Sequence, residues 1–154
     1  MRPCLIIALC ILLQYCGKRE TLPEDLLGYT LVKNISGTAA QKTVNQIHLN
    51  PVTDTNNEIG YYEKGDDKAI IYVTSYKTDD DAKTDLIKMI EKISPQNSVF
   101  VNGGQIEINE IKIYRYFGMG QTHFVFRIKN KLFWISVDTM IAREFLDTYL
   151  KKIC

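Results

Sequence analysis

The chain of 154 residues has little of several features that commonly identify a function. Its formal net charge is only +1, so it lacks the basic surplus with which proteins neutralise the phosphates of nucleic acid. It has only 9 glycines and 4 prolines, too few for a low-complexity or collagen-like chain. Hydrophobic residues make up 45%, which excludes a disordered protein because such chains lack the apolar content to offset ordering entropy. These values indicate one ordinary globular domain.

Residues that bind metals or act as nucleophiles are equally scarce. The two histidines, His48 and His123, form no HxH or HExxH motif, and no CxxC motif occurs, whereas zinc takes three or four N, S or O ligands. The acidic run at residues 79–81 lacks the central glycine and the later glutamate of an EF-hand loop. No GxSxG motif occurs either. The sequence therefore predicts no metal site, no cofactor and no catalytic residue, with an enzyme that uses His123 as the alternative.

The N-terminus has the order of charge and hydropathy of a targeting segment. A positive start is followed by an apolar run at residues 4–13, too short for a bilayer core of ~30 Å but typical of a secretory signal. No position near residues 13–19 has the small residues at −3 and −1 that signal peptidase I needs. We expect a signal peptide over residues 1–15, a tether over 16–23 and a single domain over 24–154. Plain secretion and an uncleaved anchor are the alternatives.

The end of the apolar run carries a resemblance to a known processing site. Residues 13–17 (LQYCG) resemble the lipobox of bacterial lipoproteins, with Leu13 at −3, Cys16 at +1 and Gly17 at +2. The resemblance implies that Cys16 is joined to diacylglycerol by a thioether and is N-acylated, which makes a lasting membrane anchor. Because no aspartate follows Cys16, it implies the outer membrane in a cell that has two. Cys154 would then be a lone C-terminal thiol, so no disulfide framework is expected.

The rest of the chain alternates between helix and strand patterns. Apolar spacing predicts a helix over residues 38–48. A capping box of Thr78 and Asp81 predicts a second helix, with Leu86, Ile87, Ile90 and Ile93 as its apolar stripe and Ser94-Pro95 as its end. Asp138 and Thr139 can cap a third helix, which carries Ile141, Phe145 and Tyr149 on one face. Strands are expected at residues 26–35, 58–64, 68–77, 98–101, 105–108, 111–117, 122–128 and 132–137.

These elements predict an α+β fold. We expect an antiparallel sheet of about five to seven strands, with two or three helices packed mainly on one face. Asn102-Gly103-Gly104 is expected to be a hairpin turn, and Gly118-Met119-Gly120 a turn or bulge.

The last predicted hairpin sorts its side chains into two faces, because side chains alternate along a strand. The face expected to lie under the helices is almost wholly apolar and carries Phe124, Phe126, Ile128, Phe133, Ile135 and Val137. The face expected to be more open is mixed and carries His123, Val125, Arg127, Leu132, Trp134 and Ser136. Aromatic and arginine side chains are favoured at binding hot spots, so we take His123, Arg127 and Trp134, together with Arg115, as a candidate surface for a polar or anionic partner. Cover of this face by a helix or by the N-terminal segment is the alternative.

Two longer segments resemble known domains. IIYVTSYKTDDDAKTDLIKMI (70–90) and YRYFGMGQTHFVFRIKNKLFWISVD (114–138) resemble parts of α+β domains of the PsbP/Mog1 type and of bacterial envelope proteins. This resemblance implies a non-catalytic accessory or binding module. We therefore expect an exported lipoprotein, held at the cell membrane by its N-terminal lipid, whose domain binds an unknown protein or a small-molecule ligand. A secreted or anchored enzyme and a purely structural envelope protein are the alternatives.

Overall fold

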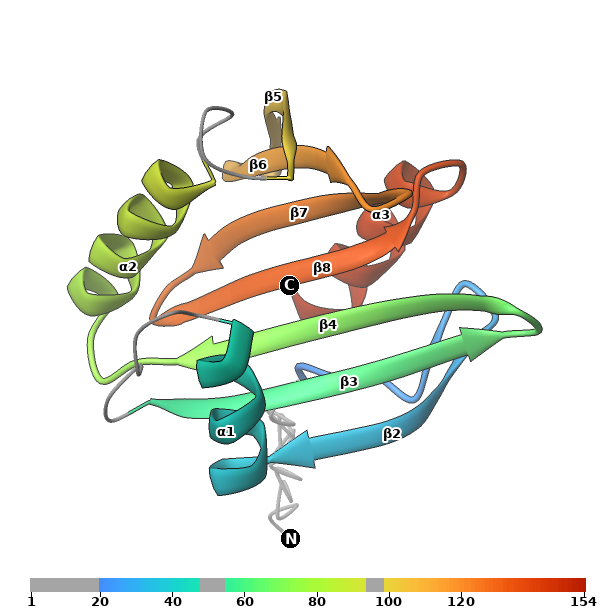
Figure 1. Ribbon diagram of the computed structural model, residues 1–154, viewed down its shortest axis with the longest axis horizontal. Coiled ribbons are helices and arrows are strands. Elements are labelled where there is room, and N and C mark those ends of the chain that lie inside the picture. The colour runs from blue at the N-terminus through green and yellow to red at the C-terminus, as the bar shows by residue number, and fades with distance from the viewer. Residues whose placement is uncertain (1–19, 48–54, 94–98) are drawn as a thin grey trace, which may run out of the picture.

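The fold is α+β, as the sequence predicts. A computed structural model describes residues 20–47, 55–93 and 99–154, and within them it has eight strands and three helices (Figure 1). In chain order these are β1 (Asp25–Leu26), β2 (Tyr29–Ser36), α1 (Gly37–Ile47), β3 (Asn56–Lys64), β4 (Asp67–Ser75), α2 (Asp79–Lys92), β5 (Val101–Ile108), β6 (Ile111–Gly118), β7 (Gln121–Ile128), β8 (Lys131–Asp138) and α3 (Ala142–Ile153).

All eight strands belong to one antiparallel sheet, in the order β1-β2-β3-β4-β8-β7-β6-β5. The prediction of five to seven strands is therefore too low. One reason is that the predicted first strand is divided in two. Leu27 and Gly28 both have positive φ and form a tight turn between β1 and β2.

The predicted turn at residues 102–104 is instead a bulge inside β5. Asn102 pairs with Tyr116 and Gln105 pairs with Tyr114, so β5 contains one more residue than its partner over this stretch. The amide of Gly104, which has a φ of +83°, donates to the side chain of Asn102 at 2.7 Å. A glycine-rich segment of this kind is compatible with either a turn or a bulge. The pairing of residues on both sides of it with β6 makes it a bulge.

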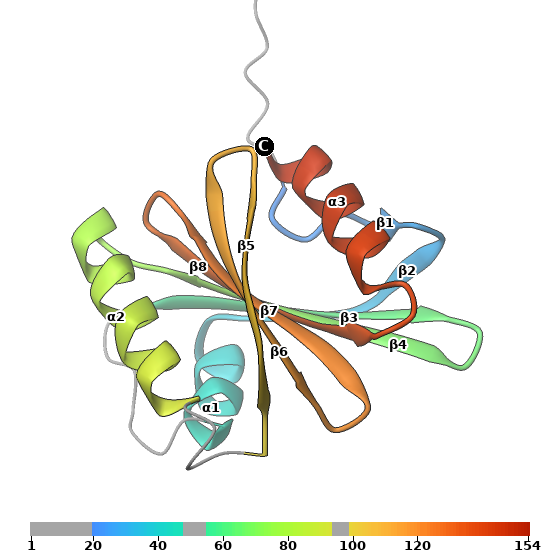
Figure 2. The ribbon, with the colours of Figure 1, turned by 90° about the horizontal axis from the view of Figure 1, so that it is seen from above.

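The helices lie on both faces of the sheet, two on one and one on the other (Figure 2). Ala40 and Val44 of α1 pack on Ile59, and Leu86 of α2 packs with Val125. These sheet residues share the face of Trp134, so the face expected to be open carries α1 and α2. The predicted division of this hairpin into two faces is confirmed, since Phe126 pairs with Phe133 and Phe124 pairs with Ile135. The apolar face carries α3, and Leu22 near the N-terminal end of the described residues packs there as well.

The largest cluster of buried residues lies between the sheet and α3. Phe126 stacks on Phe133 with 4.9 Å between ring centroids, and Phe133 meets Tyr149 of α3 edge to face. The hydroxyl of Tyr149 donates to the backbone carbonyl of Thr21 at 2.7 Å, and Leu22 is buried in the same cluster. Thr21 and Leu22, which the sequence pattern assigned to the tether, therefore pack against the domain.

Helix α2 begins as its sequence predicts. The Thr78 side chain accepts a hydrogen bond from the Asp81 amide at 3.1 Å, which satisfies one of the amides left open at a helix start. The predicted apolar stripe needs one correction. Leu86 and Ile93 are buried, but Ile87 is 48% exposed because it points away from the sheet. The predicted end at residues 94–95 lies outside the described part of the chain.

The predicted cap of α3 is wrong. The N-cap residue is Ile141, and it makes no side-chain hydrogen bond to the helix. Asp138 instead accepts from the amide of Met140 at 2.7 Å, closing the turn that leads from β8 toward the helix. Apolar contacts hold the start of α3, since Phe145 and Leu146 are fully buried.

Candidate functional site

The structure does not bring the four residues of the predicted binding surface together. Trp134 is half-buried and His123 is 2% exposed, so neither is an open recognition side chain. Arg127 shares their face, but its guanidinium donates to the carbonyl of Lys129 at 2.7 Å in the next turn. Arg115 pairs with Phe124 and so lies on the opposite face. There it donates twice to the carbonyl of Gly103, at 3.0 and 2.6 Å.

His123 is the centre of a buried polar cluster formed by β6, β7 and β8. Its Nε2 lies 3.1 Å from the carbonyl oxygen of Gly118, which can only accept, so this nitrogen carries the proton. Its Nδ1 lies 2.9 Å from Oγ of Ser136. The indole Nε1 of Trp134 donates to Nδ1 at 3.2 Å and to the Ser136 oxygen at 3.1 Å. Every ring nitrogen in this cluster is therefore hydrogen-bonded.

Burial keeps this imidazole neutral. It lowers the pKa of His123, and the hydrogen bond to the Gly118 carbonyl offsets part of that effect. A histidine beside a serine hydroxyl is also the arrangement used by enzymes with a serine nucleophile. Here the indole N–H donates to both partners, so both the base nitrogen and the hydroxyl are occupied by Trp134.

Phe100 completes the cluster, and sequence reasoning missed it. Its ring meets His123 and Trp134 edge to face, with centroids 4.8 and 5.7 Å away. Phe100 precedes β5 and lies between two exposed valines, so the sequence pattern does not predict that its ring packs over His123. The structure shows how closely Phe100 covers this site, because a Cβ added at Gly118 would lie only 2.6 Å from the Phe100 ring.

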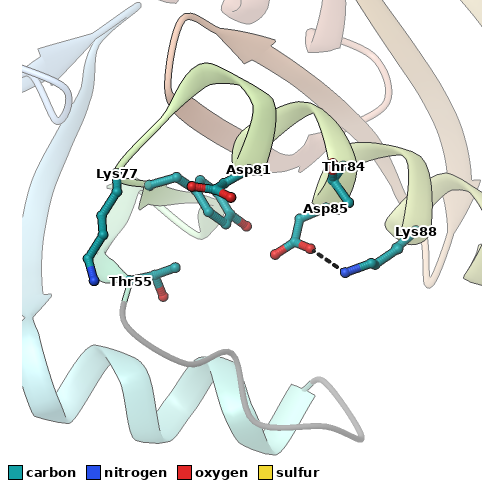
Figure 3. A pocket seen from close by; sticks show the side chains of 7 residues that line it. Thr55, Lys77, Asp81, Thr84, Asp85 and Lys88 are labelled. Atoms are coloured by element: carbon teal, nitrogen blue, oxygen red, sulfur yellow. Dashed lines mark hydrogen bonds and ion pairs between the residues drawn. The ribbon is translucent and has the colours of Figure 1, made fainter.

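A polar groove lies between the end of β4 and the first turns of α2, with a volume of about 270 Å³ (Figure 3). Side chains of both charges line it, together with hydroxyl groups. The lining residues are Thr55, Tyr76, Lys77, Asp81, Thr84, Asp85 and Lys88. His123 is not among them.

Ionic and hydrogen-bonded contacts hold the groove in shape. Asp85 and Lys88 form an ion pair at 3.1 Å, one turn apart on α2. Burial raises the pKa of the Tyr76 phenol, and the charge of Asp85 and a hydrogen bond to it raise it further. Tyr76 is fixed from the other side by its backbone, whose amide and carbonyl both bond to Asn130. The phenol is therefore neutral and held in place beside one carboxylate.

The sequence pattern assigned Tyr76 and Lys77 to the end of a strand and Asp81 to the start of a helix, and it identified no site there. The capping box placed Asp81 correctly. The signal that could have revealed more is Tyr76, an aromatic residue between the end of a strand and a charged helix.

The other sequence-based expectations concern the termini and metals. Cys16 and His48 lie outside the described part of the chain. Cys154 is an exposed thiol after the last turn of α3. Within residues 20–47, 55–93 and 99–154, no group of three His, Cys, Asp or Glu side chains could hold a metal ion. None of the described helices has the length and apolar character of a membrane span.

Comparison of the chain with models of protein families, with curated proteins and with solved structures finds no match. Its function is therefore inferred from its own residues. Two features carry that inference, the N-terminal segment ending at Cys16 and the mixed-charge groove beside Tyr76.

Proposed function

We propose that this protein is an envelope lipoprotein whose domain binds a small polar ligand in the groove beside α2, without catalysing a reaction. The observation that carries the binding role is the groove itself. It offers two carboxylates, two ammonium groups and a fixed phenol within about 270 Å³. A hollow of this size holds one small molecule or the end of a peptide chain.

The charges of the groove favour a ligand that carries both signs. A purely anionic ligand would lie against Asp81 and Asp85, and a purely cationic one against Lys77 and Lys88. A zwitterion, such as an amino acid or a short peptide, can place its ammonium group near the carboxylates and its carboxylate near the lysines. Charged groups of the wrong sign exclude other ligands, which is how such sites gain specificity.

Binding is tested by titrating the ¹⁵N-labelled domain with amino acids and dipeptides, and with erythritol as a neutral polar control. We expect zwitterions to shift the amide resonances around Tyr76 and α2, and erythritol to leave them in place. Asp85→Asn should weaken binding by roughly tenfold, the effect of about 1.4 kcal/mol for one charged contact. Lys42→Met on α1 is the matched control and should bind normally. If no zwitterion shifts these resonances, the proposed ligand class is wrong.

The lipid anchor is tested separately, by intact-mass spectrometry of the protein from its native membrane fraction. The proposal predicts a chain that begins at Cys16 and carries acyl groups. Cys16→Ser should abolish the added mass and release the protein, whereas Cys154→Ser should change neither. A soluble and unmodified wild-type chain would contradict the proposed lipid anchor. It would not bear on the proposed ligand groove, which the titration tests separately.

A further inference from the structure

The first residues of β5 lie at the edge of the sheet, where Arg115 of β6 also donates twice to the carbonyl of Gly103. β5 is an edge strand and pairs only with β6. Before its bulge it has two paired residues, Val101 with Phe117 and Asn102 with Tyr116. Val101 is 65% exposed, and Val99 before it is 71% exposed. Phe100 between them packs inward, and its ring contacts with His123 and Trp134 help to hold this end of the strand.

The His123 cluster is complete only while the imidazole is neutral. In that state Nε2 donates to Gly118 and Nδ1 accepts from Trp134. A proton on Nδ1 would face the indole N–H, which cannot accept. The oxygen of Ser136 would then have to accept from both rings at once. A charged ring also needs water, and His123 is 2% exposed beneath Phe100.

Few charged groups face this ring from the elements packed against it. β6 contributes Tyr116, which pairs with His123, and β8 contributes Asp138 one position beyond Ser136 on the same face. Arg127 is the charged residue of β7 on this face. Helix α2 faces the cluster with uncharged side chains, Leu86, Met89, Ile90 and Ile93. Within the described residues, no charged side chain is a cause of the shifted pKa of His123.

We propose that His123 is a pH-operated latch, in which protonation of the imidazole releases Phe100 and the first residues of β5 from the sheet. Phe100 is the neighbour that can move, since the others belong to paired strands in the middle of the sheet or to α2. Its departure admits water to the ring and leaves the β6–β7–β8 ladder intact. A mildly acidic environment would thus expose an apolar ring and free the edge of the sheet.

The sequence provides a specific probe for the latch, because Trp134 is the only tryptophan. A protonated imidazole quenches an adjacent indole, and loss of the Phe100 ring admits water to it. We expect the fluorescence of the wild-type protein to change on titration from about pH 8 to about pH 5, the range in which histidine gains its charge. His123→Gln, which keeps one donor and one acceptor, should abolish the transition. His48→Gln, at the only other histidine, should keep it.

Release of the strand is measured by hydrogen exchange, corrected for the intrinsic pH dependence of the rates. Amides of residues 100–103 should lose roughly tenfold in protection at about pH 5, as expected of a local opening, while β7 and β8 stay protected. Phe100→Ala should lack this protection at both pH values, and His123→Gln should keep it at both. Equal loss over the whole sheet, or the same loss in His123→Gln, would overturn the latch. So would a wild-type protein without a fluorescence transition.

Discussion

Nε1 of Trp134 lies 3.2 Å from Nδ1 of His123 and 3.1 Å from Oγ of Ser136, so one indole N–H joins polar groups on two neighbouring strands. The indole can only donate, and it therefore requires an unprotonated Nδ1. Because protonation of Nδ1 would break this bond, protonation of His123 should destabilise the fold.

The pH dependence of stability follows from that requirement. Burial holds the pKa of His123 below the ordinary value of 6.5, so the unfolded chain takes up a proton at a higher pH than the folded one. The contribution of neutral His123 to the free energy of unfolding should be complete above pH 6.5 and should decrease as the pH drops below that value. Urea unfolding at several pH values measures this. His123→Gln should flatten the curve near pH 6, and an unchanged curve would contradict this role of the histidine.

Gly118→Ala should destabilise the domain because the site of the new Cβ is occupied. That Cβ would lie 2.6 Å from the Phe100 ring and 3.1 Å from the carbonyl of Val99. We expect a loss of about 1–3 kcal/mol, as for other overpacked positions, measured by urea unfolding. The double variant Gly118→Ala with Phe100→Ala should lose less than the sum of the two single variants, since the ring that clashes is gone. Simple additivity would show that the two residues do not interact.

Thr78→Ala should weaken the start of α2. The Thr78 oxygen accepts from the Asp81 amide, and loss of a cap of this kind costs about 1 kcal/mol. Thr84→Ala is the matched control, because Thr84 is exposed inside the same helix. It should leave stability unchanged or raise it slightly, since alanine is the better helix former. A loss as large in the control as in Thr78→Ala would mean that the cap contributes nothing specific.

Met119→Asn should stabilise the β6–β7 turn. Met119 has a φ of +52° and is 71% exposed, so it occupies a left-handed conformation that asparagine tolerates better. We expect a gain of up to about 1 kcal/mol in thermal or urea unfolding. Met140→Asn serves for comparison, because Met140 is 91% exposed and does not have a positive φ. It should change stability little, and no difference between the two variants would count against strain at Met119.

Local signals in the sequence predicted the start of α2 and the faces of the last hairpin correctly, but not the cap of α3. The Thr78 cap depends on residues three positions apart, and the structure has it. The alternation of faces in β7 and β8 depends on a period of two, and the pairing of Phe126 with Phe133 confirms it. The bulge at residues 102–104 shows the limit, because pairing with another strand decides between a bulge and a turn.

The candidate binding surface shows the same limit more strongly. The sequence placed His123 and Trp134 on the same face of the sheet, and in the structure they are in contact. It joined Arg115 to them, but the register of β6 against β7 puts that residue on the opposite face. A shift of one residue between strands exchanges the two faces, and the geometry of the turn between β6 and β7 helps to set that register.

The sequence by itself determined the α+β class, the start of α2 and the division of the last hairpin into two faces, because these follow from local periodicity and capping. Only the tertiary structure decided what covers each face. It placed α2 and Phe100 over the mixed face and α3 over the apolar one. The physical reason is that burial depends on which distant segment gains most by packing there. The side chain of Phe100 is partly buried against Gly118 and His123, which are distant from it along the chain.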